Sequence, residues 1–277
     1  TVGRLVEWSK RSDFNTKYLE QNFGLGGGWD SINVPLGADR YLRLVGQIDR
    51  IDEYTADGQT YGMVIDYKSG GAKVSAQDVY YGLKLQLMTY LLALESAYGR
   101  THGDAMSPAA VVYTYVKNPQ TSSDAPISYD DASELAKKNS TLQNSGYFAD
   151  DVELLTHIDN QVLNYGSGKG PYVPLRIGKD QQIHKGDKPK VKSSGDFDVM
   201  CRYTRHVMAR AGQQIGDGLF PIKPYQLNGV RPCTYCEYQN VCRFDSSRNQ
   251  YNYLSRLAEE DALNSMKEAL NEGGEDH

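Results

Sequence analysis

The sequence has no long apolar run and few cysteines, and both absences narrow the class of protein. No stretch of about 18 consecutive apolar residues occurs, so we expect no transmembrane helix. Four cysteines in 277 residues are too few for a disulfide framework. The first residues, TVGRLVEWSK, contain neither an initiating Met nor the apolar core of a signal peptide. We therefore expect a cytoplasmic domain cut from a longer chain.

The chain also lacks an excess of positive charge. Its net charge is −5, but residues 251–277 alone hold two basic and seven acidic side chains, and 2 − 7 = −5. The rest of the chain therefore sums to about zero and can still present basic stretches to phosphates. Residues 176–192 form one such stretch, with six Lys and Arg against two Asp. It is either a solvated loop or a contact to the DNA backbone.

Hydrophobic periodicity predicts an α/β core in residues 1–116. Residues 1–15 are mildly helical, and strands are expected at 17–23, 41–54, 60–68 and 108–116. The turn ADGQ between the second and third strands contains Asp57-Gly58, a hairpin signal. Residues 75–98 predict one long helix, with Ser75 as its N-cap and Gly99 as its stop. The glycine-rich segment FGLGGGWD is followed by SINVPLG, which carries no helix signal, so we interpret the glycine run as a flexible loop.

The pattern weakens after residue 116. Residues 117–193 are rich in Ser, Asn, Gly, Lys and Pro, and we interpret them as an insertion or lid with short helical pieces at 131–138 and 150–163. Two further helices are expected at 197–215 and at the acidic 249–270. Residues 194–277 are thus a helical C-terminal part of the same domain.

Three charged residues on the predicted hairpin form a candidate active site. Because side chains alternate along a strand, Asp66 and Lys68 project from one face and Tyr67 from the other, and pairing through the turn brings Asp49 toward Asp66. Two carboxylates on an apolar sheet are costly unless they pair or bind a cation. Mg²⁺ takes such ligands together with a substrate phosphate, and Lys68 would then orient the attacking water or stabilise charge on phosphorus. An ordinary surface Asp–Lys pair is the alternative.

Two nearby features favour the site. Gly46 would let a backbone or a substrate approach the strand closely. Gln86 and Tyr90 lie four residues apart on the predicted helix and so share a face, where they could bond bases or phosphates. Polarity of an ordinary helix surface is the alternative for this pair.

Three cysteines lie close together near the C-terminus. Cys233, Cys236 and Cys242 are spaced C-x2-C-x5-C, and a CxxC pair can bind one metal in a tight turn. A 4Fe–4S cluster needs four ligands, usually cysteines. The other cysteine, Cys201, falls in a predicted helix and is expected in the core. Zinc is the alternative metal for this site.

The motifs occur in a recognisable order. GQIDRID, DYKSG and QLMTY resemble the RecB-like branch of the PD-(D/E)XK nuclease superfamily. PCTYCEYQNVCRF is similar to the tail of the iron–sulfur nuclease domains found in B subunits of AddAB/RexAB-type helicase–deoxyribonucleases. Together the motifs cover roughly residues 17–116 and 200–248.

The resemblance implies a restriction-endonuclease-like fold, with a mixed central sheet flanked by helices. It implies that Asp49 and Asp66 bind Mg²⁺, that the Tyr67 carbonyl supplies a third oxygen and that Lys68 is catalytic. Gln86 and Tyr90 match the family's Gln–Tyr motif, and Glu20 falls where relatives often carry a glutamate. The cysteines at 233, 236 and 242 would hold a 4Fe–4S cluster, with the fourth cysteine and one further metal ligand expected upstream of Thr1.

The implied function is an exonuclease in double-strand break repair and recombination. It would degrade single-stranded DNA ends opened by a helicase, as a heterodimer with a helicase–nuclease A subunit. A stand-alone RecB-like exonuclease with an iron–sulfur cluster is one alternative. A catalytically silent DNA-binding or subunit-docking module of the same fold is another, although the retained Asp–Asp–Lys set argues against it.

Overall fold

A computed structural model describes residues 2–26, 28–37, 39–101, 106–116, 126, 128 and 143–272. At its centre lies a six-stranded sheet in the order β1-β4-β5-β6-β7-β8. The pairs β5–β6 and β7–β8 are parallel and the others antiparallel, so the sheet is mixed. Its strands are β1 (Asn15–Phe23), β4 (Gly46–Ala56), β5 (Gln59–Lys68), β6 (Ser107–Tyr115), β7 (Ser145–Ala149) and β8 (Val191–Lys192).

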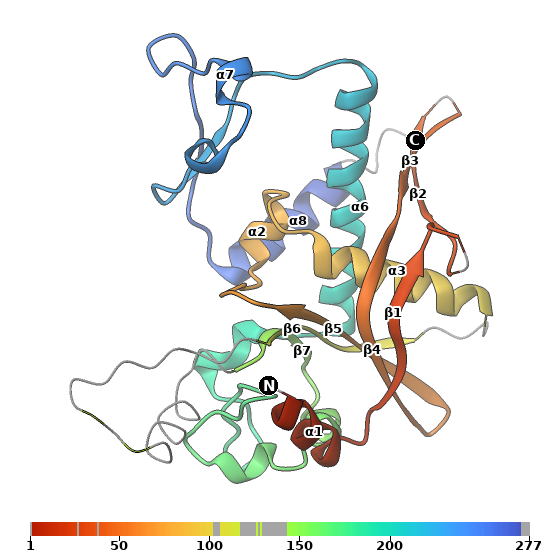
Figure 1. The fold of residues 1–277 in the computed structure, drawn as a ribbon. Coiled ribbons are helices and arrows are strands. Elements are labelled where there is room, and N and C mark those ends of the chain that lie inside the picture. The colour runs from red at the N-terminus through yellow and green to blue at the C-terminus, as the bar shows by residue number, and fades with distance from the viewer. Residues whose placement is uncertain are drawn as a thin grey trace.

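Helices cover both faces of the sheet (Figure 1). One face packs against α2 (Ala76–Tyr80), α3 (Gln86–Thr101), α6 (Ser194–Gly216) and α8 (Glu259–Glu272). The other packs against α1 (Val2–Arg11), α5 (Val152–Ile158) and the segment that follows α5. This architecture confirms the predicted mixed sheet flanked by helices.

The central strand β5 shows why its sequence lacks a strict alternation. Val64 belongs to one core, whereas Met63 and Ile65 belong to the other, and all three are fully buried. A strand that is covered on both faces reads as a continuous apolar run. A polar side chain on such a strand is therefore unusual, and Asp66, the residue after Ile65, is one.

No strand is predicted for SINVPLG, yet the structure has one there. Residues Ile32–Gly37 form β2, which pairs with β3 (Arg40–Leu44) in an antiparallel hairpin. Ile32 and Val34 are buried against the helical face, so the segment does alternate, and only Pro35 obscured the pattern. Val45 separates β3 from β4, and the single strand predicted for 41–54 is therefore two strands.

The helix predicted for 75–98 is also two elements. Ser75 caps α2 as expected, because its hydroxyl accepts the Asp78 N–H. The chain then leaves the helix at Gly82, whose φ of +72° is left-handed, and α3 begins at Gln86. Gly99 does not end α3, which continues to Thr101.

The second half of the chain shares the same sheet. The described residues 143–192 contribute β7 and β8 to the sheet and, through α5 and the segment after it, also cover one of its faces. The predicted helix at 150–163 is α5 followed by a 3-10 turn, Val162–Tyr165. The helical piece expected at 131–138 lies outside the described residues. The helix expected at 197–215 is confirmed as α6.

A small exposed segment separates α6 from α8. It contains the parallel pair β9 (Tyr225–Leu227) and β10 (Asn252–Leu254), the 3-10 turn η4 (Pro232–Tyr235) and α7 (Gln239–Cys242). Figure 1 shows it extending away from the sheet. The final helix predicted from residue 249 is wrong at its start, since α8 begins at Glu259. Within the described ranges, no helix combines the length and apolar character needed to cross a membrane.

Candidate active site

The β4–β5 hairpin sets the position of the two candidate carboxylates. Asp57 and Gly58 both have left-handed φ values, 50° and 79°, as a tight hairpin turn requires. The resulting register runs from Ala56–Gln59 to Arg50–Ile65, so Asp49 and Asp66 come one position past the last pair. The Asp49 carboxylate accepts the Tyr67 backbone N–H at 2.8 Å. The structure thus brings Asp49 beside the Asp66–Lys68 segment.

Asp66 is a buried carboxylate with an incomplete set of partners. Its side chain is 2% exposed, and its Oδ2 lies 2.6 Å from Lys68 Nζ. Among the described residues this oxygen has no hydrogen bond of good geometry. Burial raises the pKa of Asp66 above its ordinary range, the Lys68 ammonium opposes that rise and the Asp49 carboxylate adds to it. A buried oxygen beside a second carboxylate suits a hard divalent cation such as Mg²⁺.

Lys68 is held from three sides. Besides Asp66, its ammonium donates to Gln86 Oε1 at 2.9 Å and lies 5.2 Å from the centre of the Tyr113 ring. The amide of Gln86 in turn donates to the Tyr90 hydroxyl at 2.8 Å. The expectation that Gln86 and Tyr90 share a face is confirmed. Their observed contacts orient the lysine, so ordinary helix-surface polarity does not describe this pair.

The break between α2 and α3 explains how Gln86 reaches the lysine. α2 ends at Tyr80, the chain turns at Gly82, and Gln86 is the first residue of α3. Tyr113 was not predicted. It pairs in register with Asp66 on the neighbouring strand β6, and burial raises its pKa to about 12. The apolar run of β6 gave no sign of this, because the sequence does not reveal the register of a parallel pair.

Gly46 does admit a close neighbour, but this neighbour is a side chain and not the expected backbone or substrate. The Phe23 ring packs on Gly46, and a Cβ there would lie 2.8 Å from Phe23 Cζ, so neither backbone nor substrate uses the space. Phe23 also packs edge-on against Tyr90, with ring centroids 6.3 Å apart. Gly46 therefore supports the site by admitting an aromatic side chain behind Tyr90.

Tyr67 touches this network through its backbone N–H, which binds Asp49, and Glu20 lies apart from it. The Tyr67 side chain projects into the opposite core, as predicted from strand alternation, which leaves its carbonyl as the predicted ligand. Glu20 lies on the edge strand β1 with an exposed side chain and a φ of 49°. Its carbonyl accepts the Gln47 amide at 3.4 Å. No contact of Glu20 in the described residues points to a role in the site.

The cysteines are not gathered into a metal centre. Cys233, Cys236 and Cys242 are half-buried free thiols on η4 and α7. Across the described ranges, no three His, Cys, Asp or Glu side chains are grouped as a metal site would need. Cys201 is 2% exposed within the helical core, as expected, so it is remote from solvent and from such a role. The arrangement therefore does not itself support a cluster.

Half of the basic side chains in the stretch 176–192 are paired within the protein. Arg176 and Lys169 both pair with the buried Asp187, at 2.7 and 2.5 Å. Lys188 pairs with Asp150, and Lys192 is 4% exposed beside Glu259. Three of the six basic side chains, Arg176, Lys188 and Lys192, are thus paired within the protein, which reduces the charge available for a contact to the DNA backbone.

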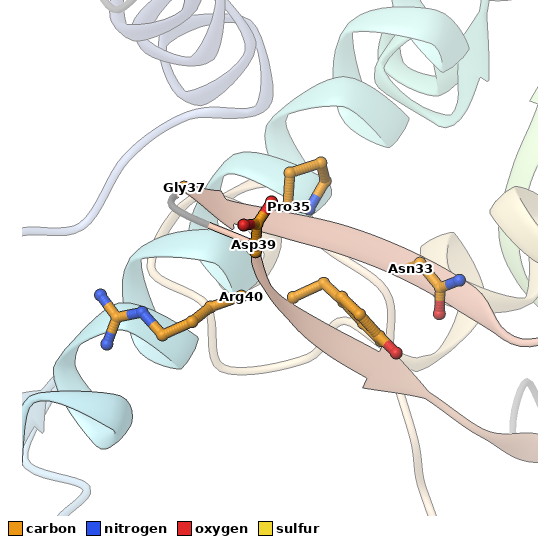
Figure 2. Close-up of a pocket in the computed structure, with 6 residues that line it drawn as sticks. Asn33, Pro35, Gly37, Asp39 and Arg40 are labelled. Atoms are coloured by element: carbon orange, nitrogen blue, oxygen red, sulfur yellow. The ribbon is translucent and has the colours of Figure 1, made fainter.

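A surface hollow lies elsewhere, on the outer face of the β2–β3 hairpin (Figure 2). Its lining is Asn33, Pro35, Gly37, Asp39, Arg40 and Tyr41. None of these belongs to the Asp49–Asp66–Lys68 network, and Arg40 is already paired with Asp217 at 3.1 Å. We therefore place the candidate chemistry at the β4–β5 hairpin and not in this hollow.

The mixed sheet with Asp49, Asp66 and Lys68 on its central hairpin defines the class of protein. Residues 1–243 match the PD-(D/E)XK nuclease superfamily, and the chain belongs to that family. Its similarity to individual proteins extends further along the chain. It is 30% identical over 272 residues to the B subunit of the ATP-dependent helicase/deoxyribonuclease of Clostridium botulinum strain Hall. The protein of the same description from Listeria welshimeri is 32% identical over 264 residues.

These similarities cover nearly all of the chain but a small part of the relatives. The aligned residues make up 98% of this chain and 23% of the C. botulinum protein, and 95% and 22% in the L. welshimeri case. A third relative of that description, from Ruminiclostridium cellulolyticum, is 31% identical with shares of 98% and 23%. The chain thus spans about a quarter of these relatives.

Proposed function

We propose that this chain is a Mg²⁺-dependent DNA nuclease domain. The observation that carries the proposal is the continuous set of contacts from the carboxylates through Lys68 to Gln86 and Tyr90. A surface Asp–Lys pair would be solvated, whereas here Asp66 is buried and the ammonium has its place fixed by a second side chain. Such fixed donors and acceptors suit chemistry at a phosphate.

Each residue has a distinct part. Asp49, Asp66 and the Tyr67 carbonyl would hold Mg²⁺, which when bound supplies an activated water and neutralises charge on the scissile phosphate. Gln86 Oε1 accepts a hydrogen bond from the Lys68 ammonium, which has three N–H donors in all. The remaining donors can face Asp66 and an oxygen of the water or the phosphate. Tyr90 fixes which way the Gln86 amide points, because its hydroxyl accepts the amide N–H.

We infer the setting of this reaction from the relatives. Their description as B subunits of a helicase/deoxyribonuclease supports a DNA substrate and a partner helicase subunit. In this proposal the domain degrades single-stranded DNA ends, acts in double-strand break repair and recombination in the cytoplasm, and works in a heterodimer with a helicase–nuclease A subunit. The similarity concerns about a quarter of each relative, so these statements are proposals for the larger protein.

A 4Fe–4S cluster on the three cysteines is supported by their C-x2-C-x5-C spacing alone. The test is iron and sulfide analysis after anaerobic reconstitution, with Cys236→Ser as the comparison. Iron and sulfide bound to the original chain and lost in the variant support the cluster. Stoichiometric zinc supports the alternative, and absence of both metals refutes a metal site on this chain.

The nuclease proposal is tested by cleavage of labelled single-stranded DNA in Mg²⁺. Asp66→Asn and Lys68→Met should each abolish cleavage, and Asp66→Asn should also abolish Mg²⁺ binding measured by calorimetry. Asp217→Asn and Lys223→Met make the same changes on exposed residues outside the site and should cleave like the original chain. Equal inactivity of the original chain and all variants would support the catalytically silent module.

A further inference from the structure

A buried ion pair lies directly behind the candidate metal site. Arg50 and Asp52 alternate along β4 and so share a face, and the guanidinium binds the carboxylate with two hydrogen bonds of 2.7 and 2.6 Å. Both side chains are at least nine-tenths buried. Their register partners on β5 are Ile65 and Met63, which belong to the core on the side opposite the catalytic lysine.

Stability alone does not account for this pair. Burial of two charges carries a desolvation cost that their attraction often fails to offset, and apolar replacements of similar volume are often neutral or stabilising. The neighbours on this face, including Ile65 and Met63, are apolar, so apolar side chains would suit the same space. The contacts that the pair makes with its neighbours offer a further explanation.

Arg50 holds Tyr67, the residue between Asp66 and Lys68. Its Nη1 donates to the Tyr67 hydroxyl at 3.5 Å, and the centre of the Trp8 ring of α1 lies 5.8 Å from the guanidinium carbon. Trp8 is itself fixed, because its indole N–H donates to the Ile158 carbonyl at 3.0 Å. The Tyr67 side chain is thus bound to Arg50 of β4, and Arg50 is itself held against Trp8 of α1.

The contact between Arg50 and Tyr67 lies where the pairing of β4 with β5 ends. The last paired residues of β4 and β5 are Arg50 and Ile65, so no backbone pairing fixes the separation of the next residues, Asp49 and Asp66. Two contacts continue the connection, and both use Tyr67: its N–H binds the Asp49 carboxylate, and its hydroxyl binds Arg50. Tyr67 therefore joins the two sides of the site.

We propose that Arg50, clamped by Asp52 and Trp8, is a positioning residue that fixes Tyr67 and thereby the spacing of Asp49 and Asp66 for a divalent cation. The inference rests on the proposed function, because it concerns the same metal site. Residues that orient metal ligands typically change metal affinity 10- to 100-fold when they are replaced, roughly the range expected here.

The test replaces the pair by apolar residues. In the variant Arg50→Met/Asp52→Leu, urea unfolding should show a folded protein, while the Mg²⁺ dissociation constant from calorimetry should rise about 10-fold or more. Tyr67→Phe, which removes only the hydroxyl, should raise the constant in the same direction by a smaller factor. The matched control is Tyr165→Phe, since Tyr165 bonds Arg11 at 2.8 Å far from the site.

The outcomes separate the two proposals. A folded double variant whose Mg²⁺ constant is unchanged refutes the positioning role and leaves the nuclease proposal intact. If the double variant does not fold, Tyr67→Phe decides, and affinity equal to that of Tyr165→Phe refutes the role. If the original chain binds no Mg²⁺ and cleaves no DNA, the proposed function is refuted, and the positioning inference is refuted with it.

Discussion

Gly46 offers a sharp test of how packing supports the active site. Alanine at this position would bring a Cβ to 2.8 and 2.9 Å from two atoms of the Phe23 ring, distances that require one side to move. Phe23 is 1% exposed and packs against Tyr90, so its ring has no open space to enter. Overpacking of this kind costs about 1–3 kcal/mol.

The effect of Gly46→Ala should reach the chemistry as well as the stability. A displaced Phe23 presses on Tyr90, which orients Gln86 and through it the Lys68 ammonium. We expect the melting temperature to fall by about 2–4 °C per kcal/mol, and DNA cleavage to fall at temperatures where the variant is still folded. Thermal unfolding measures the fall in melting temperature, and a cleavage assay below that temperature measures the fall in activity.

A control and a double variant make this reasoning refutable. Gly99 lies on α3 with open space where a Cβ would be, so Gly99→Ala should leave cleavage unchanged. It should raise the free energy of unfolding by up to about 1 kcal/mol. In a Phe23→Leu background, Gly46→Ala should cost at least about 0.5 kcal/mol less than it does alone. Costs that simply add, or a Gly46→Ala variant as stable and active as the original, would show that the Phe23 contact does not constrain the site.

Three further predictions concern the frame around the site. Gly82→Ala should cost about 1–2 kcal/mol in urea unfolding, because φ is +72° and the Cβ would meet Val207 at 2.9 Å; an unchanged value contradicts the turn. Ser75→Ala should cost about 1 kcal/mol through loss of the α2 cap, whereas Ser255→Ala should cost little. Burial alone would raise the pKa of Asp187, but Arg176 and Lys169 lower it to about 2. Its folded pKa is depressed, so the carboxylate stabilises the fold above about pH 4 and loses that effect as pH falls toward 2. Asp187→Asn should flatten the pH dependence of unfolding in this window, and an equally steep profile would contradict the assignment.

Local chemistry in the sequence determined the central hairpin. Asp57-Gly58 specifies a tight turn, and strand alternation places Asp66 and Lys68 on one face and Tyr67 on the other. Helical spacing likewise places Gln86 and Tyr90 together. These predictions succeeded because they depend on backbone geometry over a few residues, which is the same in any fold.

Local sequence patterns did not predict the secondary structure where tertiary packing decided it. Pro35 and the glycines before it suggested a loop, but burial of Ile32 and Val34 against the helical face makes β2 a strand. Apolar periodicity suggested one helix from 75 to 98, whereas Gly82 turns the chain and starts α3 at Gln86, beside Lys68.

Only the tertiary structure decided which side chains complete the site. Tyr113 reaches Lys68 through the register of two parallel strands, and Phe23 reaches Gly46 across an antiparallel pair. Nothing in the sequence indicated the Arg50–Asp52 pair, which the fold buries behind Tyr67. The sequence determined which candidate catalytic groups share a face, because that follows from alternation along a strand. The environment of those groups depends on contacts between segments far apart in the chain, and these form only when the sheet and its helices pack together.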